Sequence, residues 1–202
     1  MAFNVSTFRS KMEFDGARPN LFKVLMTGPA INSRANPEAD FEFFARATSI
    51  PGSTIGTVTV PYMGREIKLA GNRTFADWTV TVINDENFSY RGVFEEWMDS
   101  INIHENNYRQ GTGNSVDYTT SQAYVQQLTK TGSAASPQII REYQFHNMFP
   151  IDISEITLDW GDNDSVEEFT VTFAYDYWNV KFPNPKTGGT GPEGRGPTSG
   201  TA

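Results

Sequence analysis

Residues 64–86 read GREIKLAGNRTFADWTVTVINDE, and this stretch decides the fold class. It holds two runs of alternating apolar and polar residues separated by Gly71-Asn72. Both Gly and Asn tolerate positive φ, so this pair predicts a hairpin turn. The alternation that starts at Trp78 predicts a strand over residues 74–84, with side chains pointing to opposite faces in turn. The stretch therefore favours an antiparallel sheet.

The period of the pattern changes directly after this strand. Asp85 can accept backbone N–H bonds at the start of a helix. Tyr90, Phe94, Trp97 and Ile101 follow at spacings of three or four residues, which is the apolar stripe of a helix that lies on a core. We expect one long helix here.

Further alternating runs lie on both sides of the central stretch. In the last run Phe169, Val171 and Phe173 share one face, and with Trp78, Phe94 and Trp97 they are the expected core. Strands with turn signals between them and one helix predict a mainly β fold, an antiparallel β-sandwich or partly closed barrel with one flanking α-helix. The other strands are expected at residues 21–26, 41–48, 55–62, 65–69, 117–130, 138–147, 154–159 and 166–177, the last two joined by a turn at 161–164.

Composition limits the functional classes. The chain has 202 residues, enough for one domain, and no cysteine, which excludes disulfides and thiol catalysis. Its net charge of −8 disfavours DNA binding, because proteins bind the phosphates of DNA through Lys and Arg. No signal peptide and no apolar run of about 20 residues is seen, so we expect no membrane anchor. We divide the chain into an N-terminal arm (1–16), one domain (17–182) and a flexible Gly/Pro-rich tail (183–202).

No catalytic or ligand-binding motif stands out. His104 and His146 are the only histidines, and no Gly-x-Ser-x-Gly elbow accompanies them. The acidic residues around Asp159–Asp164 lack the spacing of a calcium loop and suit a tight turn. Gly111-x-Gly113 is not followed by the Lys-Ser/Thr of a phosphate loop. We therefore expect no catalytic, cofactor-binding or metal-binding residue, no cofactor and no enzymatic activity.

Four blocks of the chain, in order and at similar spacing, resemble the tail tube proteins of contractile-tailed bacteriophages (myoviruses). The blocks are residues 17–24 (ARPNLFKV), residues 64–86, Phe149-Pro150 with 156–160 (ITLDW), and 169–172 (FTVT) with 175–178 (YDYW). The resemblance extends from about Ala17 to Trp178. Relative to shorter family members, the chain has longer loops at residues 28–38 and 102–115 and the additional tail.

The resemblance implies a structural virion protein. In this family six copies form a ring whose sheets join into a continuous β-barrel lumen, and the rings stack into a tube inside a contractile sheath. The implied partners are further copies, the tail sheath protein, and the baseplate and tail-terminator proteins. Genomic DNA and the tape-measure protein would pass through the lumen without specific binding. The implied location is the virion tail, after folding and assembly in the host bacterial cytoplasm.

Unusually polar strands suggest which sheet faces the lumen. We expect residues 41–48, 55–69, 117–130 and 138–147 to form the lumen sheet, and residues 21–26, 74–84, 154–159 and 166–177 to form the outer sheet. A lumen biased to acidic and neutral groups would repel phosphates. The candidate lumen or intersubunit residues are Phe41, Arg46, Thr57, Thr59, Arg65, Lys68, Thr119, Ser121, Gln126, Arg141, Gln144 and His146.

Three alternative functions remain open from the sequence. Within the same class, the chain could be a baseplate protein that initiates the tube, or the tube protein of a related contractile injection apparatus. Outside this class, its Tyr and Trp residues could stack on sugars in a glycan-binding β-sandwich.

Overall fold

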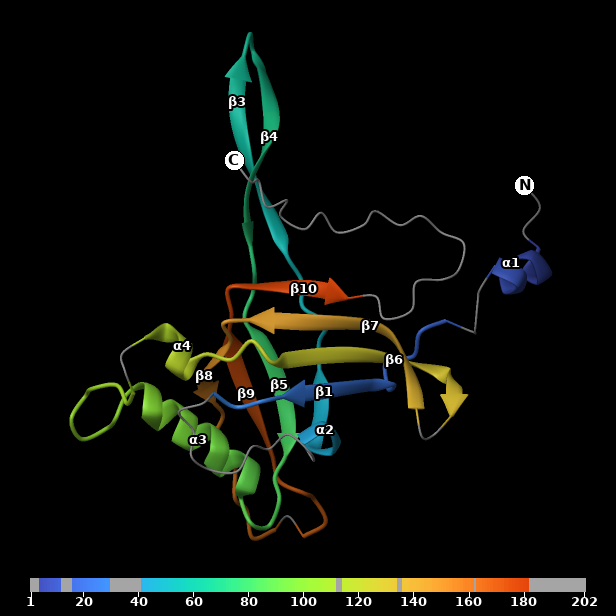
Figure 1. Cartoon of the computed structure of the whole chain (residues 1–202). Helices are drawn as coiled ribbons and strands as arrows, with labels where there is room; N and C mark the ends of the chain where they lie inside the picture. Colours follow the sequence, from blue (N-terminus) through green and yellow to red (C-terminus); the bar gives the residue numbers. More distant parts are fainter. Residues whose placement is uncertain are drawn as a thin grey trace, which may run out of the picture.

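Two four-stranded antiparallel sheets, a two-stranded ribbon and four helices make up the described part of the chain (Figure 1). The computed structural model describes residues 4–11, 16–29, 41–111, 114–133, 136–161 and 163–181. The expected tail and most of the expected loop at residues 28–38 lie outside these ranges, as do parts of the expected N-terminal arm.

The first sheet, which we call the larger sheet because it contains the two longest strands, has the order β1-β6-β7-β10. Its strands are β1 (Phe22–Met26), β6 (Ala123–Ser133), β7 (Ser136–His146) and β10 (Tyr177–Lys181). The strands β6 and β7 form a hairpin, and β1 and β10 flank it. The edges of this sheet are therefore β1 and β10, two strands that lie far apart in the sequence.

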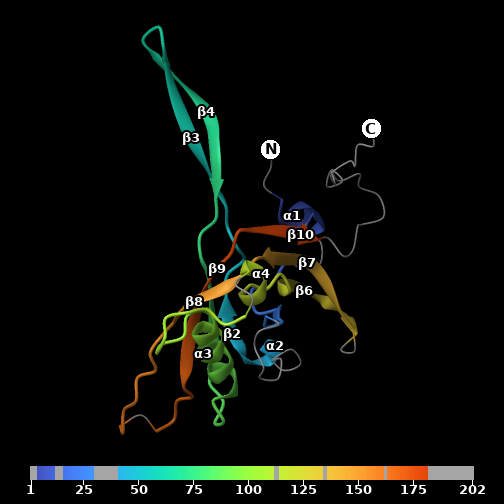
Figure 2. The ribbon, with the colours of Figure 1, turned by 60° about the vertical axis from the view of Figure 1, so that its left-hand side comes forward.

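The second sheet has the order β2-β5-β9-β8 and packs across the first. Its strands are β2 (Ala45–Thr48), β5 (Trp78–Ile83), β9 (Glu168–Ala174) and β8 (Phe149–Ile153). In Figures 1 and 2 its strands run at a steep angle to those of the larger sheet.

The core fills the space between the sheets, as strict alternation of side chains predicts. Val24 and Met26 of β1, and Tyr143 and Phe145 of β7, point into it from the larger sheet. The six expected core residues are all at most 1% exposed: Trp78, Phe94, Trp97, Phe169, Val171 and Phe173. The core is thus a sandwich rich in aromatic rings.

Helix α3 (Ser89–Ile101) is the long helix that the apolar stripe predicted. It buries Tyr90, Phe94 and Trp97 against the second sheet. Asp85 Oδ1 accepts the backbone N–H of Ser89 at 2.9 Å, which stabilises the first turn. Helix α3 is the one long helix of the described residues; the shorter helices α1 (Val5–Lys11), α2 (Phe41–Phe44) and α4 (Ser115–Tyr118) were not predicted.

The strands β3 (Thr54–Tyr62) and β4 (Arg65–Thr74) form a ribbon that projects from one end of the molecule, as all three figures of the whole chain show. The predicted turn at Gly71-Asn72 is wrong, since both residues lie inside β4. The turn is at Met63 and Gly64, whose φ values of 46° and 80° suit a two-residue hairpin.

Gly71 has a different role from the predicted one. A Cβ atom placed there would lie 3.0 Å from the Gly56 carbonyl oxygen on β3. The residue therefore allows two backbones to approach closely, which is a common reason for glycine inside a strand.

Four further strand predictions need correction. The strand expected at residues 117–130 begins only at Ala123, since residues 115–118 form α4. Residues 41–44 are helical, because Phe41 and Phe44 pack on Tyr90 with ring centroids 5.9 and 4.5 Å away. Residues 154–159 are not a strand, and β9 pairs instead with β8. The predicted strand at 166–177 ends at Ala174, and Tyr177 begins β10 in the other sheet. At residues 41–44 and at β10, contacts with residues distant in the sequence override the local pattern.

Candidate functional site

The face of the larger sheet that points away from the core is a continuous polar surface, which we call the polar face. Its residues alternate with the buried ones along each strand and lie opposite one another across the strands. They are Lys23, Leu25, Tyr124, Gln126, Glu142, Gln144, His146, Tyr177, Asn179 and Lys181. No strand of the described residues covers this face. Most of its residues are partly exposed, whereas Gln126 is buried at 7% exposed.

One cross-strand row of the polar face carries its charges. Lys23, Gln126, Glu142 and Lys181 are consecutive partners in the registers of β1, β6, β7 and β10. Glu142 accepts a hydrogen bond from Gln126 Nε2 at 2.6 Å and lies 3.8 Å from Lys181 Nζ. Lys23 forms an ion pair with Glu42 of α2. Both lysines thus have a carboxylate partner within the same copy.

The neighbouring rows hold amide and aromatic groups. Gln144 Nε2 donates to the Ser121 carbonyl at 2.9 Å and lies 3.3 Å from the Tyr124 hydroxyl. His146 stacks on Tyr177 with ring centroids 4.5 Å apart, and its Nε2 lies 3.0 Å from Asn179 Nδ2. Burial, and next the positive charge of Lys181, lower the pKa of His146, so the ring is neutral at pH 7.

The larger sheet ends in two strands that have no strand partner on their outer sides among the described residues. These edges are β1 and β10. Thr27 N–H donates to the Gln122 carbonyl, and Leu128 N–H donates to the Leu21 carbonyl. Antiparallel pairing alternates, so the backbone groups of Phe22, Val24 and Met26 point away from β6. Such an edge can pair with a strand of another molecule.

The structure distributes the expected lumen residues over several places. Gln126, Gln144 and His146 lie on the polar face, and Ser121 adjoins it by accepting the Asn147 N–H. Arg141 lies on β7, where its Nη1 is 3.4 Å from the Tyr143 hydroxyl. The partly buried Thr119 lies between α4 and β6. Thr57, Thr59, Arg65 and Lys68 are exposed on the ribbon β3–β4.

Two of these residues have other roles in the fold. Phe41 is only 1% exposed and packs against Phe94 in the core, so it lines no surface of this chain. Arg46 of β2 forms an ion pair with Glu168 of β9 and so joins two strands of the second sheet. The aromatic and apolar neighbours of Phe41 in the sequence were a signal for burial.

The proposed grouping of strands is also corrected. The strands β6 and β7 do share a sheet, but their neighbours are β1 and β10, and β2 belongs to the second sheet. Lys23, Glu142 and Lys181 of the polar face were not among the residues predicted from the sequence. The sequence did contain a signal for Glu142. Tyr143 and Phe145 have the apolar character of core residues, so alternation along the strand places Glu142 on the opposite face.

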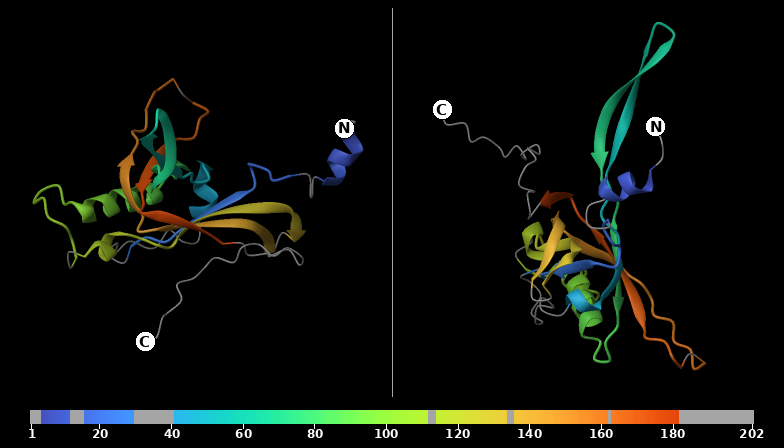
Figure 3. Two further views of the ribbon diagram at one scale, coloured as in Figure 1. Left: turned by 90° about the horizontal axis from the view of Figure 1, so that it is seen from above. Right: turned by 90° about the vertical axis from the view of Figure 1, so that its right-hand side faces the viewer.

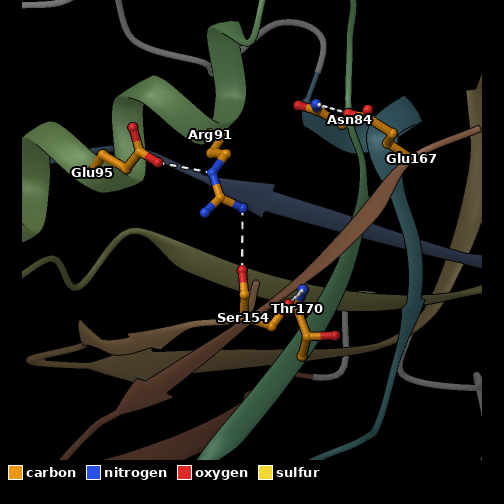
Figure 4. Close-up of polar contacts among 6 residues, drawn as sticks. All are labelled: Asn84, Arg91, Glu95, Ser154, Glu167 and Thr170. Carbon is orange, nitrogen blue, oxygen red and sulfur yellow. Dashed lines mark hydrogen bonds and ion pairs between the residues drawn. The ribbon is translucent and has the colours of Figure 1, made fainter. Parts of the chain in front are cut away.

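The connection between β8 and β9 forms a second projection, at the end opposite the ribbon (Figures 1 and 3). Figure 4 shows how its two ends are held. Arg91 of α3 donates to the Ser154 carbonyl at 3.1 Å and to Glu95 at 2.8 Å. Asn84 Nδ2 donates to Glu167 at 2.9 Å. Beyond these anchors, Leu158 and Trp160 are exposed.

The described residues show no arrangement typical of an enzyme or a metal centre. They contain no group of three or more His, Cys, Asp or Glu side chains that could hold a metal ion. His104 is exposed, and its Nε2 lies 3.9 Å from Asp99. In the same part of the chain, no helix has the length and apolar character needed to cross a membrane.

Comparisons with known sequences agree on one family. The family model described as phage tail tube protein matches residues 11–181. Tail tube protein gp19 of Enterobacteria phage T4 is 36% identical over 164 residues, which are 81% of this chain and 91% of the relative. The tail tube protein of Serratia phage KSP90 is 26% identical over 85% of this chain and 93% of the relative.

Solved structures show a similar fold at low identity. A chain from the PVC sheath-tube complex of an extracellular contractile injection system is 12% identical, with a TM-score of 0.56 over 90% of this chain and 99% of that chain. A chain from the anti-feeding prophage baseplate, described as 6-fold symmetrised, has a TM-score of 0.54 at 12% identity over 83% of this chain and 96% of that chain.

Proposed function

Because this chain belongs to the phage tail tube protein family, we propose that six copies pair the edges β1 and β10 into a closed ring. The chain itself is a structural protein of the tail tube, as its similarity to named tail tube proteins over most of their length shows. The glycan-binding alternative has no support from these relatives. The family is structural, and we propose that the chain catalyses no reaction.

The single observation that carries the ring proposal is that both edge strands of one sheet, β1 and β10, have no strand partner on their outer sides among the described residues. An unpaired edge is prone to join other strands, and a head-to-tail contact that closes satisfies every edge at once. Four strands from each of six copies would give 6 × 4 = 24 strands in one barrel. The number six is supported by the symmetry stated for the baseplate neighbour.

In the proposed ring the polar face lines the bore. The core side of the larger sheet is already covered by the second sheet, so only the polar face is left to face the lumen. The second sheet and α3 then lie outside, toward a sheath protein. Genomic DNA and the tape-measure protein are the proposed contents of the bore, and baseplate and terminator proteins the partners at the tube ends.

The ribbon β3–β4 is suited to contacts between stacked rings. It projects beyond the sheets, and its exposed side chains include Val58, Tyr62, Met63 and Leu69. Exposed apolar groups on a long ribbon are unusual in a protein that stays monomeric. We propose that they become buried when rings stack in the virion tail, after assembly in the bacterial cytoplasm.

Electron microscopy of the purified chain tests the proposal directly, with rings or hollow tubes as the expected result. A cross-link identifies the interface, since the natural chain has no cysteine. Leu25→Cys and Asn179→Cys place one thiol on each edge strand, and a flexible bis-maleimide should give a ladder of covalent species that stops at the hexamer.

The matched control replaces one edge thiol with a thiol on α3. Leu25→Cys combined with Asp99→Cys should give no such ladder, because α3 lies on the second sheet. A chain that stays monomeric at high concentration, or a control ladder equal to that of the edge pair, contradicts edge pairing.

A further inference from the structure

We infer that Glu142 keeps the polar face from binding polyanions, by holding Lys181 and Gln126 within the copy to which they belong. The inference rests on the proposed function, in which this face lines the bore. From the sequence we expect a bore that repels phosphates through an excess of acidic groups. The inference is instead that positive and negative groups balance on this face and that its amide donors already have partners.

The charge of the polar face is not that of the whole chain. The chain carries −8, whereas the polar face has Lys23 and Lys181 as cations and Glu142 as its acid. Glu42 of α2 pairs with Lys23, so each lysine has one carboxylate. Repulsion from an excess of acids on this face therefore cannot explain how DNA would pass.

Glu142 has a central position in this balance. Its side chain is 17% exposed, against 56% for Lys181, so the carboxylate is sheltered while the ammonium group reaches solvent. One of its oxygens accepts from Gln126 and the other lies near Lys181. Gln126 is only 7% exposed, so the donor for which this carboxylate competes with a passing phosphate is the ammonium group of Lys181.

The remaining amide groups of the polar face also have partners. The amide groups of Gln144 and Asn179 contact the Ser121 carbonyl and His146, respectively. Lys181 also lies 5.5 Å from the ring centre of Tyr124. Phosphates are bound by lysine, arginine and free amide donors, so a face on which these groups are paired offers weak attachment.

The test uses assembled tubes and a fluorescent single-stranded DNA oligonucleotide short enough to enter the bore. Glu142→Gln leaves Lys181 without its carboxylate and removes six negative charges per ring. Binding should tighten by about tenfold at low salt and weaken steeply as salt rises, since each phosphate contact releases a counterion. Glu86→Gln, exposed ahead of α3, is the control with the same change of charge.

A compensating variant makes the test specific to the pair. Glu142→Gln combined with Lys181→Gln removes both charges and should return binding to the level of the Glu86→Gln control. Equal binding by Glu142→Gln and Glu86→Gln tubes, or tight binding by unaltered tubes, overturns the inference while leaving the tube itself intact.

Assembly defects are separated from the inference by a second measurement. If Glu142→Gln forms no tubes, the unassembled proteins are compared on heparin–agarose, because no described strand covers the polar face in the single chain. Elution of Glu142→Gln at higher salt than Glu86→Gln supports the inference, and elution at the same salt overturns it. Failure of the unaltered chain to form any ring counts against the proposed function instead.

Discussion

The indole ring of Trp78 in β5 lies against the phenyl ring of Phe145 in β7, with centroids 4.5 Å apart and an interplanar angle of 31°. The two residues belong to different sheets, so their contact joins the layers of the sandwich. The indole N–H also donates to the Ser49 carbonyl at 2.9 Å. Trp78 thus combines core packing with a satisfied polar group.

Replacing Trp78 with Ala should lower the free energy of unfolding by about 3–5 kcal/mol, because it leaves a cavity between the sheets. Trp160→Ala is the matched control, since Trp160 is fully exposed and its loss should change stability by less than about 0.5 kcal/mol. Urea denaturation of the unassembled chain measures both. Similar losses for the two variants would contradict this description of the core.

Tyr175→Phe should leave stability unchanged or raise it by about 1 kcal/mol. The hydroxyl group of Tyr175 is buried and has no hydrogen-bond partner among the described residues, so its removal relieves an unsatisfied polar group. A loss of more than 1 kcal/mol in thermal denaturation at pH 7 would indicate a partner for this hydroxyl.

Tyr175→Phe should also change how the free energy of unfolding depends on pH above pH 9. Burial, and next the negative charge of Asp77, raise the pKa of Tyr175 above its ordinary value of 10.0. The unfolded chain therefore loses this proton at lower pH than the folded chain, and stability falls as pH rises above about 10. Without the phenol, Tyr175→Phe should lose less stability between pH 9 and pH 11 than the unaltered chain.

Arg91→Ala should lower the free energy of unfolding by about 1.5–3 kcal/mol. The guanidinium group that it removes donates to the Ser154 carbonyl and lies 5.5 Å from the ring centre of Phe169. Glu95→Ala removes only the exposed helical ion pair and should cost about 0.3–0.5 kcal/mol. The difference reports what Arg91 contributes beyond that pair. Faster amide exchange around Ser154 in Arg91→Ala, but not in Glu95→Ala, would place the effect at the β8–β9 connection.

Gly71→Ala should destabilise the ribbon by about 1–3 kcal/mol, since the new methyl group would lie 3.0 Å from a backbone oxygen and 3.1 Å from a backbone carbon of Gly56. Gly52→Ala is the control, because its methyl group would meet no atom within 4 Å. Hydrogen exchange of the amides in β3 and β4 measures local opening without relying on global unfolding. Equal exchange in the two variants would show that the ribbon adapts without cost.

The sequence predicted the strongly periodic elements well. The apolar stripe from Tyr90 to Ile101 is α3, and the alternation after Trp78 is β5. It placed the Gly71-Asn72 turn wrongly, because a close approach of backbones and a turn both call for glycine. It also extended the last strand past Ala174, although Asp176 there accepts a hydrogen bond from Asn147 and the chain crosses to the larger sheet.

Part of the candidate site could be predicted and part could not. The polar character of β6 and β7 was visible in the residues, and Gln126, Gln144 and His146 lie on the polar face as a result. The pairing of Glu142 with Lys181 was not visible, because 39 positions separate them and only the register of β7 and β10 brings them together.

The sequence alone thus determined the main strands and the long helix, since alternation and helical spacing depend on neighbours along the chain. It also carried the resemblance to the family. The choice of partner strands depended on three-dimensional packing. Whether β10 continues beside β9 or crosses to β7 is set by which arrangement buries Trp178 and Val180 against the core and satisfies the backbone of β7. That comparison involves groups far apart in the sequence. Its outcome makes β10 an edge of the larger sheet and places Lys181 beside Glu142.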